Sequence, residues 1–224
     1  MHVLACILRH IWSTTSRAFV MALWASASSA GHRAATLSLV RLLIQDKRYG
    51  TSPELRPVEE RFKQLLQRGA TEDRDALTLQ GELLFQQGRL GLAATTLQRA
   101  LHLHQDSDPV GTGTSDGADA GRSLDFEWRP YCVLCLARVR AAMGRRENAK
   151  ELLESLAAGP EGFVAADVEL VRLGLLTPEE ARQSMYNAAC HGRRDMFERL
   201  AESEGEGPEK NLWVLEWSRL AGAA

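Results

Sequence analysis

Three turn glycines, each standing between two amphipathic runs, constrain the fold of this chain more than any other feature of its sequence. Gly88, Gly144 and Gly192 each follow a run with apolar residues at helical spacing and precede another such run. Glycine often ends a helix, because it adopts the left-handed backbone conformation at little cost. Two helical runs joined by a short turn predict a helical hairpin, so we expect hairpins around all three glycines.

The composition favours helices over strands throughout the chain. Ala, Leu, Arg, Glu and Gln dominate its 224 residues, β-branched residues are sparse, and only 6% of residues are aromatic. The hydrophobic fraction of 45% is sufficient for a sizeable core. We therefore expect an all-α protein of the α-α superhelix class, a short solenoid of helical hairpins.

One helix start is marked with particular clarity. In the run Thr177-Pro178-Glu179-Glu180, the threonine hydroxyl can cap free backbone N–H groups and the proline suits the first helical position. Glu180 stands three residues after Thr177, which completes the pattern of a capping box. A helix is predicted from this point to about Cys190.

The stretch of residues 76–104 resembles a tetratricopeptide repeat, and it fits the Sel1-like subfamily more loosely. The apolar, small and turn residues of that family occur here in order and spacing at Leu77, Gly81, Leu84, Gly88, Leu90, Ala93, Leu97 and Ala100. In this pattern Gly81 and Ala93 allow two helices to approach closely, while Leu84 and Leu97 fill the space around them. The two later hairpins match through fewer positions, and the usual proline after the second helix is absent at Gln105.

The resemblance implies a binding function in a concave groove lined by the first helix of each hairpin. By analogy with the family, five side chains would face this groove and contact a peptide or helix of another protein: Thr78, Glu82, Arg138, Arg182 and Tyr186. The Lys and Asn cluster of the variants that bind chaperone tails is missing, so a chaperone tail is not the expected ligand.

Residues 1–45 have the composition of a mitochondrial targeting leader. They contain Arg9, Arg17, Arg33 and Arg41 and no carboxylate, so this stretch carries +4 while the whole chain carries −2 and the remainder −6. A secretory signal within this stretch, or an N-terminal helix with no address, are the alternatives. We expect localisation to the mitochondrial matrix or to the inner membrane as a peripheral protein.

The rest of the chain divides into a linker and a helical domain. Residues 46–57 are rich in turn formers and read as the linker, and residues 58–224 read as the domain of helical hairpins. Within it, residues 106–124 are rich in Gly, Asp, Ser and Thr and are predicted to form a disordered loop. Trp213 and Trp217 share a helix face with Leu220, either to seal the last repeat or to anchor a partner.

No sequence motif indicates catalysis. Cys132 and Cys135 form a single C-x-x-C, for which two small side chains in a helix core are a simpler reading than a metal site. We predict a non-enzymatic scaffold or assembly factor that binds another protein, with no cofactor, no metal and no transmembrane segment. An organellar RNA-binding helical-repeat protein is the alternative, which the acidic remainder and the lack of a repeated polar code disfavour.

Overall fold

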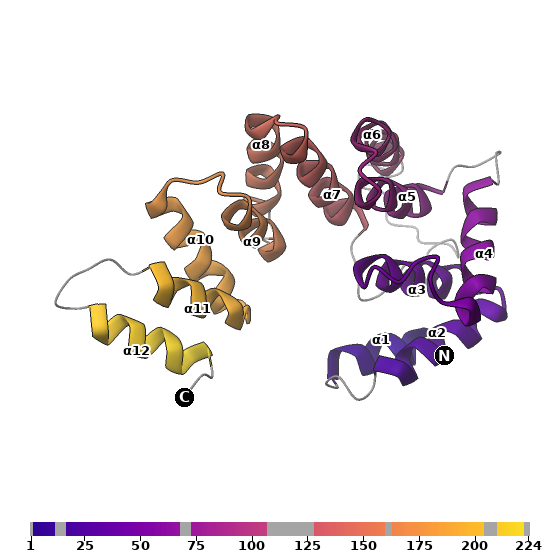
Figure 1. The fold of residues 1–224 in the computed structure, drawn as a ribbon, viewed down its shortest axis with the longest axis horizontal. Coiled ribbons are helices and arrows are strands. Elements are labelled where there is room, and N and C mark those ends of the chain that lie inside the picture. The colour runs from indigo at the N-terminus through magenta and orange to yellow at the C-terminus, as the bar shows by residue number, and fades with distance from the viewer. Residues whose placement is uncertain are drawn as a thin grey trace, which may run out of the picture. The chain divides into compact units, whose positions relative to one another are not determined.

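The computed structural model describes residues 2–11, 17–67, 73–106, 128–159, 163–203 and 210–221 (Figure 1). These residues form α-helices and one short 3-10 helix, and the described part of the chain contains no β-strand. The helices are α1 (His2–Ile11), α2 (Arg17–Ser29), α3 (Arg33–Gln45), η2 (Pro53–Leu55), α4 (Arg56–Gln67), α5 (Arg74–Gln86), α6 (Leu90–Asp106), α7 (Trp128–Ala142), α8 (Arg146–Ala157), α9 (Val164–Arg172), α10 (Pro178–Cys190), α11 (Arg194–Ser203) and α12 (Lys210–Ala221).

The protein is all-α, as the sequence predicts, and its helices pack on their neighbours along the chain in the manner of a solenoid of helical hairpins. The chain divides into two compact units, which are described separately. Unit 1 comprises residues 1–135, and unit 2 comprises residues 136–224. Helix α7 contributes its first half to unit 1 and its second half to unit 2.

Helix α3 forms the centre of unit 1. Ten of its thirteen residues are buried, in a run that is continuous from Ala34 to Val40. A helix that is apolar nearly all round must be covered on several sides, and α3 indeed contacts α2, α4 and α5. Trp24 of α2 and Phe62 of α4 are among the largest fully buried side chains of the protein.

The hairpin of α5 and α6 has the close helix contact that the sequence predicts. A Cβ atom placed on Gly81 would lie 2.4 Å from Cγ of Leu97, so only glycine allows this approach without a shift of the leucine. Ala93 and Leu97 are completely buried, whereas Leu84 is only half-buried. The packing role predicted for Leu97 is therefore confirmed, since it fills the space beside Gly81.

The three turn glycines end helices as predicted. Gly88, Gly144 and Gly192 have φ angles of 74°, 79° and 90°, which lie in the left-handed region that glycine tolerates best. Each turn satisfies carbonyl groups at the end of the preceding helix. The amide of Gly88, for example, donates to the carbonyl of Phe85, and the amide of Arg89 donates to that of Leu84.

Unit 2 is a succession of shorter helices around a smaller core. Helix α8 contacts α9, α9 contacts α10, and α10 forms a hairpin with α11, against which α12 packs. The capping box predicted at Thr177 is present, with the Thr177 side chain and the Glu180 backbone amide paired, and Glu180 returning a bond to the Thr177 amide. The core cluster consists of Met185, Ala188, Ala189, Met196, Leu200 and Trp217.

The predicted leader contains α1, α2 and α3. Residues 17–45 form α2 and α3, so the boundary expected at residue 45 falls at the end of the most buried helix of unit 1. The expected linker, residues 46–57, is a turn-rich connection to residue 52 and then passes into η2 and the start of α4. The expected disordered loop at residues 106–124 lies outside the described residues from position 107 onward.

No helix in the described part of the chain combines the length and the apolar character that crossing a membrane requires.

Candidate functional site

The five side chains predicted to line a binding groove fall into two groups. Thr78 and Glu82 belong to α5 in unit 1, whereas Arg138, Arg182 and Tyr186 belong to α7 and α10 in unit 2. Each group has its own local environment within its unit.

Thr78 and Glu82 lie in the interior of unit 1 and do not face an open surface. Thr78 is completely buried, and its hydroxyl donates to the backbone carbonyl of Arg74 over 2.9 Å. Glu82 is buried too, and its carboxylate accepts a hydrogen bond of 2.5 Å from the hydroxyl of Tyr131. Both polar groups therefore have hydrogen-bond partners inside unit 1, and Glu82 joins α5 to α7 through Tyr131.

Tyr131 is the centre of this buried polar cluster. The guanidinium carbon of Arg41 lies 5.2 Å from the centre of its ring, which is a cation–π distance. Burial raises the pKa of the Tyr131 hydroxyl, and the neighbouring Cys135 and Glu82 raise it further. The tyrosine therefore stays protonated and acts as a hydrogen-bond donor.

The C-x-x-C pair has the properties of core residues. Cys132 and Cys135 are both buried and unbonded to each other, and the Cys132 thiol donates to the Leu97 carbonyl over 3.4 Å. Burial raises the pKa of Cys132 to about 11, which leaves almost no reactive thiolate at neutral pH. Among the described residues, no three His, Cys, Asp or Glu side chains are grouped in a way that could hold a metal ion.

Arg138 is partly buried and is paired within unit 2. Its guanidinium donates to the carboxylate of Glu169 on α9 over 2.7 Å, and the Glu169 side chain is nearly inaccessible to solvent. This ion pair joins α7 to α9. It leaves Arg138 with a structural role and a partly exposed surface.

Arg182 and Tyr186 lie on α10 and are exposed, as a binding role requires. The Tyr186 side chain is 46% exposed, and its ring makes an edge contact with Trp217 of α12 at a centroid distance of 6.1 Å. Trp217 in turn stacks on Phe197 of α11 at 5.8 Å. Trp217 itself is buried, in agreement with the reading that α12 seals the last hairpin, while the Trp213 side chain lies outside the described residues.

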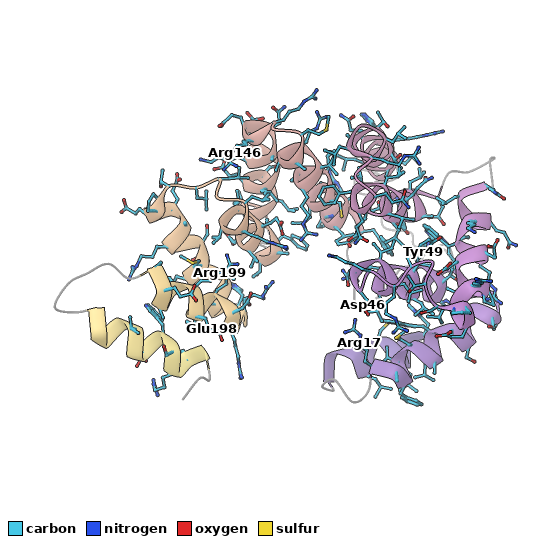
Figure 2. The ribbon with its side chains drawn as sticks, viewed as in Figure 1. Arg17, Asp46, Tyr49, Arg146, Glu198 and Arg199 are labelled. Atoms are coloured by element: carbon cyan, nitrogen blue, oxygen red, sulfur yellow. The ribbon has the colours of Figure 1, made fainter. Side chains whose placement is uncertain are left out.

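The arginines of the predicted leader have structural partners that sequence reasoning missed. Figure 2 shows Arg17 and Asp46 side by side, where they form an ion pair. Arg33 at the start of α3 donates two hydrogen bonds to Asp73, over 2.6 and 2.5 Å, and a third to Asp75 over 2.6 Å. The start of α3 is thereby tied to the start of α5.

The two carboxylates that bind Arg33 have pKa values that shift in opposite directions. Burial alone would raise the pKa of Asp73, but the bonds from Arg33 and from the backbone amides of Asp75 and Ala76 lower it. Burial raises the pKa of Asp75, and Arg33 compensates only in part because Asp73 adds a like charge. The position of Asp73 before α5, where it caps the helix, was the only sequence signal for this ion-pair cluster.

Comparisons with known proteins report on the fold. No protein-family model matches the sequence, and no curated protein matches it significantly. Among solved structures, BtubC (BKLC) from P. vanneervenii is similar, with a TM-score of 0.55 and 15% sequence identity over 89% of this chain and 86% of that chain. At this identity the likeness concerns the fold alone, and it agrees with an all-helical chain of successive hairpins.

Proposed function

We propose that this chain is a non-enzymatic helical-repeat protein that binds another protein as a scaffold or assembly factor. The observation that carries the proposal is the exposed Tyr186 of α10, whose ring contacts the buried Trp217, which in turn stacks on the partly buried Phe197. Tyrosine and arginine are the side chains that most often dominate binding energy at protein interfaces, and Arg182 lies one turn before Tyr186 on the same face of α10.

The support of Tyr186 by Trp217 favours a role in recognition. A side chain whose position is already restricted loses little conformational entropy when a partner covers it. The exposed part of the ring and the exposed Arg182 together offer an apolar surface and a positive charge, which suits a peptide or helix that carries an apolar side chain next to a carboxylate.

We further propose that residues 76–104 form a repeat of tetratricopeptide or Sel1-like type. The supporting observations are the close contact of Gly81 with Leu97, the left-handed turn at Gly88, and the complete burial of Ala93 and Ala100. These are the positions at which the family pattern requires a small residue, a turn and a packed second helix.

A mitochondrial location, peripheral to a complex of the matrix or inner membrane, remains part of the proposal and rests on the acid-free composition of residues 1–45. Because α3 belongs to the core of unit 1, the proposal requires that an address be read from residues before Arg33 or be retained in the folded protein.

Proximity labelling in cells with a C-terminal tag tests the proposal when it is done on matched variants. The double variant Arg182→Ser/Tyr186→Ser removes the proposed contacts, and Glu198→Ser/Arg199→Ser on the exposed face of α11 is the control. We expect a mitochondrial set of neighbours enriched in one complex, which the first variant loses and the control retains.

Three results would contradict different parts of the proposal. An unchanged set of neighbours for the Arg182→Ser/Tyr186→Ser variant would exclude this face of α10. A cytosolic or secretory set would exclude the mitochondrial location alone. Tight, salt-dependent binding of the purified protein to RNA would favour the RNA-binding alternative.

A further inference from the structure

Two histidine rings meet where α1 docks on the rest of unit 1. The His2 ring of α1 stacks on the ring of His32 at a centroid distance of 5.0 Å and an interplanar angle of 30°. His2 is only 6% exposed, and the Cys6 sulfur lies 3.6 Å from its Nε2 atom. Histidine is the side chain whose ordinary charge change falls in weakly acidic solution, so this contact is one that acid can alter.

His32 caps α3, and it can do so only while its Nδ1 atom carries no proton. This atom accepts a hydrogen bond of 3.4 Å from the backbone amide of Ala35. A proton on Nδ1 turns the acceptor into a donor and places a positive charge at the start of α3, where the helix dipole is also positive. Protonation of His32 therefore removes the cap, and a second proton on the stacked His2 would add a like charge beside it.

The helices that meet at this pair supply no anion of their own. Residues 1–45 contain no carboxylate, so α1, α2 and α3 contain none. Besides the pair itself, their titratable residues are a thiol and bases: Cys6, Arg9 and His10 on α1, Arg17 on α2, and Arg33 and Arg41 on α3. The side chains of Arg9 and His10 lie outside the described residues. A thiol is ordinarily uncharged in weak acid, so Cys6 supplies no negative charge for a protonated His2.

Charged groups from later segments also reach these three helices. Three carboxylates form ion pairs with them, each with an arginine: Asp46 with Arg17, and Asp73 and Asp75 with Arg33. From α4, Arg61 donates to the hydroxyl of Ser28 at the end of α2, and this hydroxyl pairs with that of Thr36 in the first turns of α3. Arg61 thus adds a further cation to the side of unit 1 on which the histidines lie.

We infer that His2 and His32 form a pH-sensitive latch, which holds α1 on unit 1 at neutral pH and releases it in weakly acidic solution. The ion pairs of Arg17 and Arg33 hold α2 and α3 and do not involve α1, so α1 can open while the rest of unit 1 stays folded. Ten residues are too few for an isolated helix to persist in water, so α1 loses its structure on release.

The direction of the pH dependence follows from proton uptake. The docked helix buries His2 as a neutral ring, whereas the released helix takes up a proton there as free histidine does, near pH 6.5. Docking is therefore complete above about pH 6.5 and weakens as the pH falls below it. The release exposes Ala5 and Cys6, which the docked helix buries. This latch belongs to unit 1 and does not depend on the partner proposed for α10.

Hydrogen-exchange mass spectrometry of the purified full-length protein tests the latch. After correction for the intrinsic pH dependence of exchange, protection of the α1 amides should be at least about tenfold lower at about pH 5.5 than at about pH 7.5. Protection in α3, α5 and α6 should change by less than about twofold over the same range.

A double variant and a control identify the groups responsible. His2→Phe keeps a buried aromatic ring without a titratable nitrogen, and His32→Asn keeps a residue that caps helices well. The double variant His2→Phe/His32→Asn should protect α1 equally at both pH values. His102→Gln, at an exposed histidine of α6, is the control and should keep the full pH difference.

The Cys6 thiol gives a second readout that needs no change in the latch. In a Cys190→Ser background, which removes the exposed cysteine among those described, dithiodipyridine should modify Cys6 faster at about pH 5.5 than at about pH 7.5. Each rate is divided by that of free cysteine at the same pH, so that only the exposure of the thiol is compared.

The inference is overturned if the unchanged protein protects α1 equally at both pH values, or if the normalised rate at Cys6 does not rise in acid. It is also overturned if the pH difference survives in His2→Phe/His32→Asn. A parallel loss of protection in α3, α5 and α6 would overturn it as well, because acid would then unfold unit 1 as a whole.

Discussion

Helices α3 of unit 1 and α10 of unit 2 are equally long, with thirteen residues each, yet α3 buries ten of them and α10 buries three. The first is surrounded by neighbours, and the second has one covered side and one exposed side that carries Arg182 and Tyr186. Burial of this extent stabilises the fold, whereas an exposed helix side is available for recognition. The more buried of the two helices therefore lies in unit 1, and the proposed protein-binding surface lies in unit 2.

Among the described residues, the ion pairs that join the most distant positions of the sequence lie in unit 1. In unit 1, Arg33 reaches carboxylates forty and more positions away in the sequence, and Arg17 pairs with Asp46. In unit 2, Arg138 with Glu169 and Lys150 with Glu180 join different helices, and the other described pairs join residues at most four positions apart. Contacts that close long loops are made only on folding, so unit 1 should unfold as one cooperative body.

Deletion of residues 1–45 is the change that tests this comparison most severely. It removes α3, whose buried Leu, Val and Ile side chains each stabilise the fold by about 1.5–3 kcal/mol, against a total stability of about 5–15 kcal/mol. We expect the amides of α4, α5 and α6 to lose their protection in hydrogen-exchange mass spectrometry. Native-like protection in α5 and α6 after the deletion would show that this hairpin folds without residues 1–45, as expected for a removable leader.

Arg33→Gln should have the next largest effect. The substitution removes the cation that binds both Asp73 and Asp75, which are largely buried, and leaves Arg74 at 3.9 Å from Asp75. Because Arg33 is partly exposed, we expect a loss of about 2–3 kcal/mol, below the full cost of an unpaired buried charge. Urea unfolding of unit 1 measures the loss, and Arg193→Gln, which breaks an exposed pair in unit 2, should change stability by less than about 0.5 kcal/mol.

Asp73→Asn isolates the ion pair from the helix cap, because asparagine caps a helix as well as aspartate does. The folded protein holds the pKa of Asp73 below its ordinary value of 3.8. The charged Asp73 therefore stabilises the fold above pH 3.8, and this contribution is lost as the pH falls through the lower folded pKa. We expect the variant to be less stable than the unchanged protein by about 1–2 kcal/mol at neutral pH. Its free energy of unfolding should also fall less on acidification than that of the unchanged protein. If the stability of the variant fell with acid as steeply as that of the unchanged protein, other carboxylates would cause the pH dependence.

Gly81→Ala tests the contact at the centre of the α5 and α6 hairpin. The added methyl group would collide with Leu97, which costs about 1–3 kcal/mol, and the better helix propensity of alanine returns up to about 1 kcal/mol. We expect a net loss in urea unfolding. Gly91→Ala on α6 is the control, since its added methyl group meets nothing within 4 Å, and it should be neutral or stabilising. Equal effects of the two substitutions would contradict the close approach of the helices.

The hairpins could be predicted from the sequence because each depends on local signals. Gly88, Gly144 and Gly192 mark turns by a backbone preference, and Thr177 with Glu180 marks a helix start by a bond over three residues. The period of apolar residues then predicts which side of each helix is covered. Such signals do not depend on the rest of the fold.

The roles of Thr78, Glu82 and Arg33 could not be predicted because they depend on contacts between distant segments. The family pattern places Thr78 and Glu82 on the first helix of a hairpin, where they would face a groove if nothing covered them. Tyr131, almost fifty positions later, covers Glu82. In the same way, the composition of residues 1–45 predicts a leader but does not predict the ion pairs of Arg17 and Arg33, because their carboxylates lie later in the sequence.

The smallest predicted effect concerns unit 2 and the start of α10. Thr177→Ala removes the hydroxyl that caps the helix, which should cost about 0.5–2 kcal/mol, whereas Thr177→Ser keeps the bond to the Glu180 amide and should change little. Because α10 buries only three residues, the loss should appear as local opening of α10 and α11 in hydrogen exchange, with unit 1 unaffected. If exchange in α3 and α5 rose to the same extent, the two units would unfold together, and the division into a structural centre and a separate protein-binding surface would not hold.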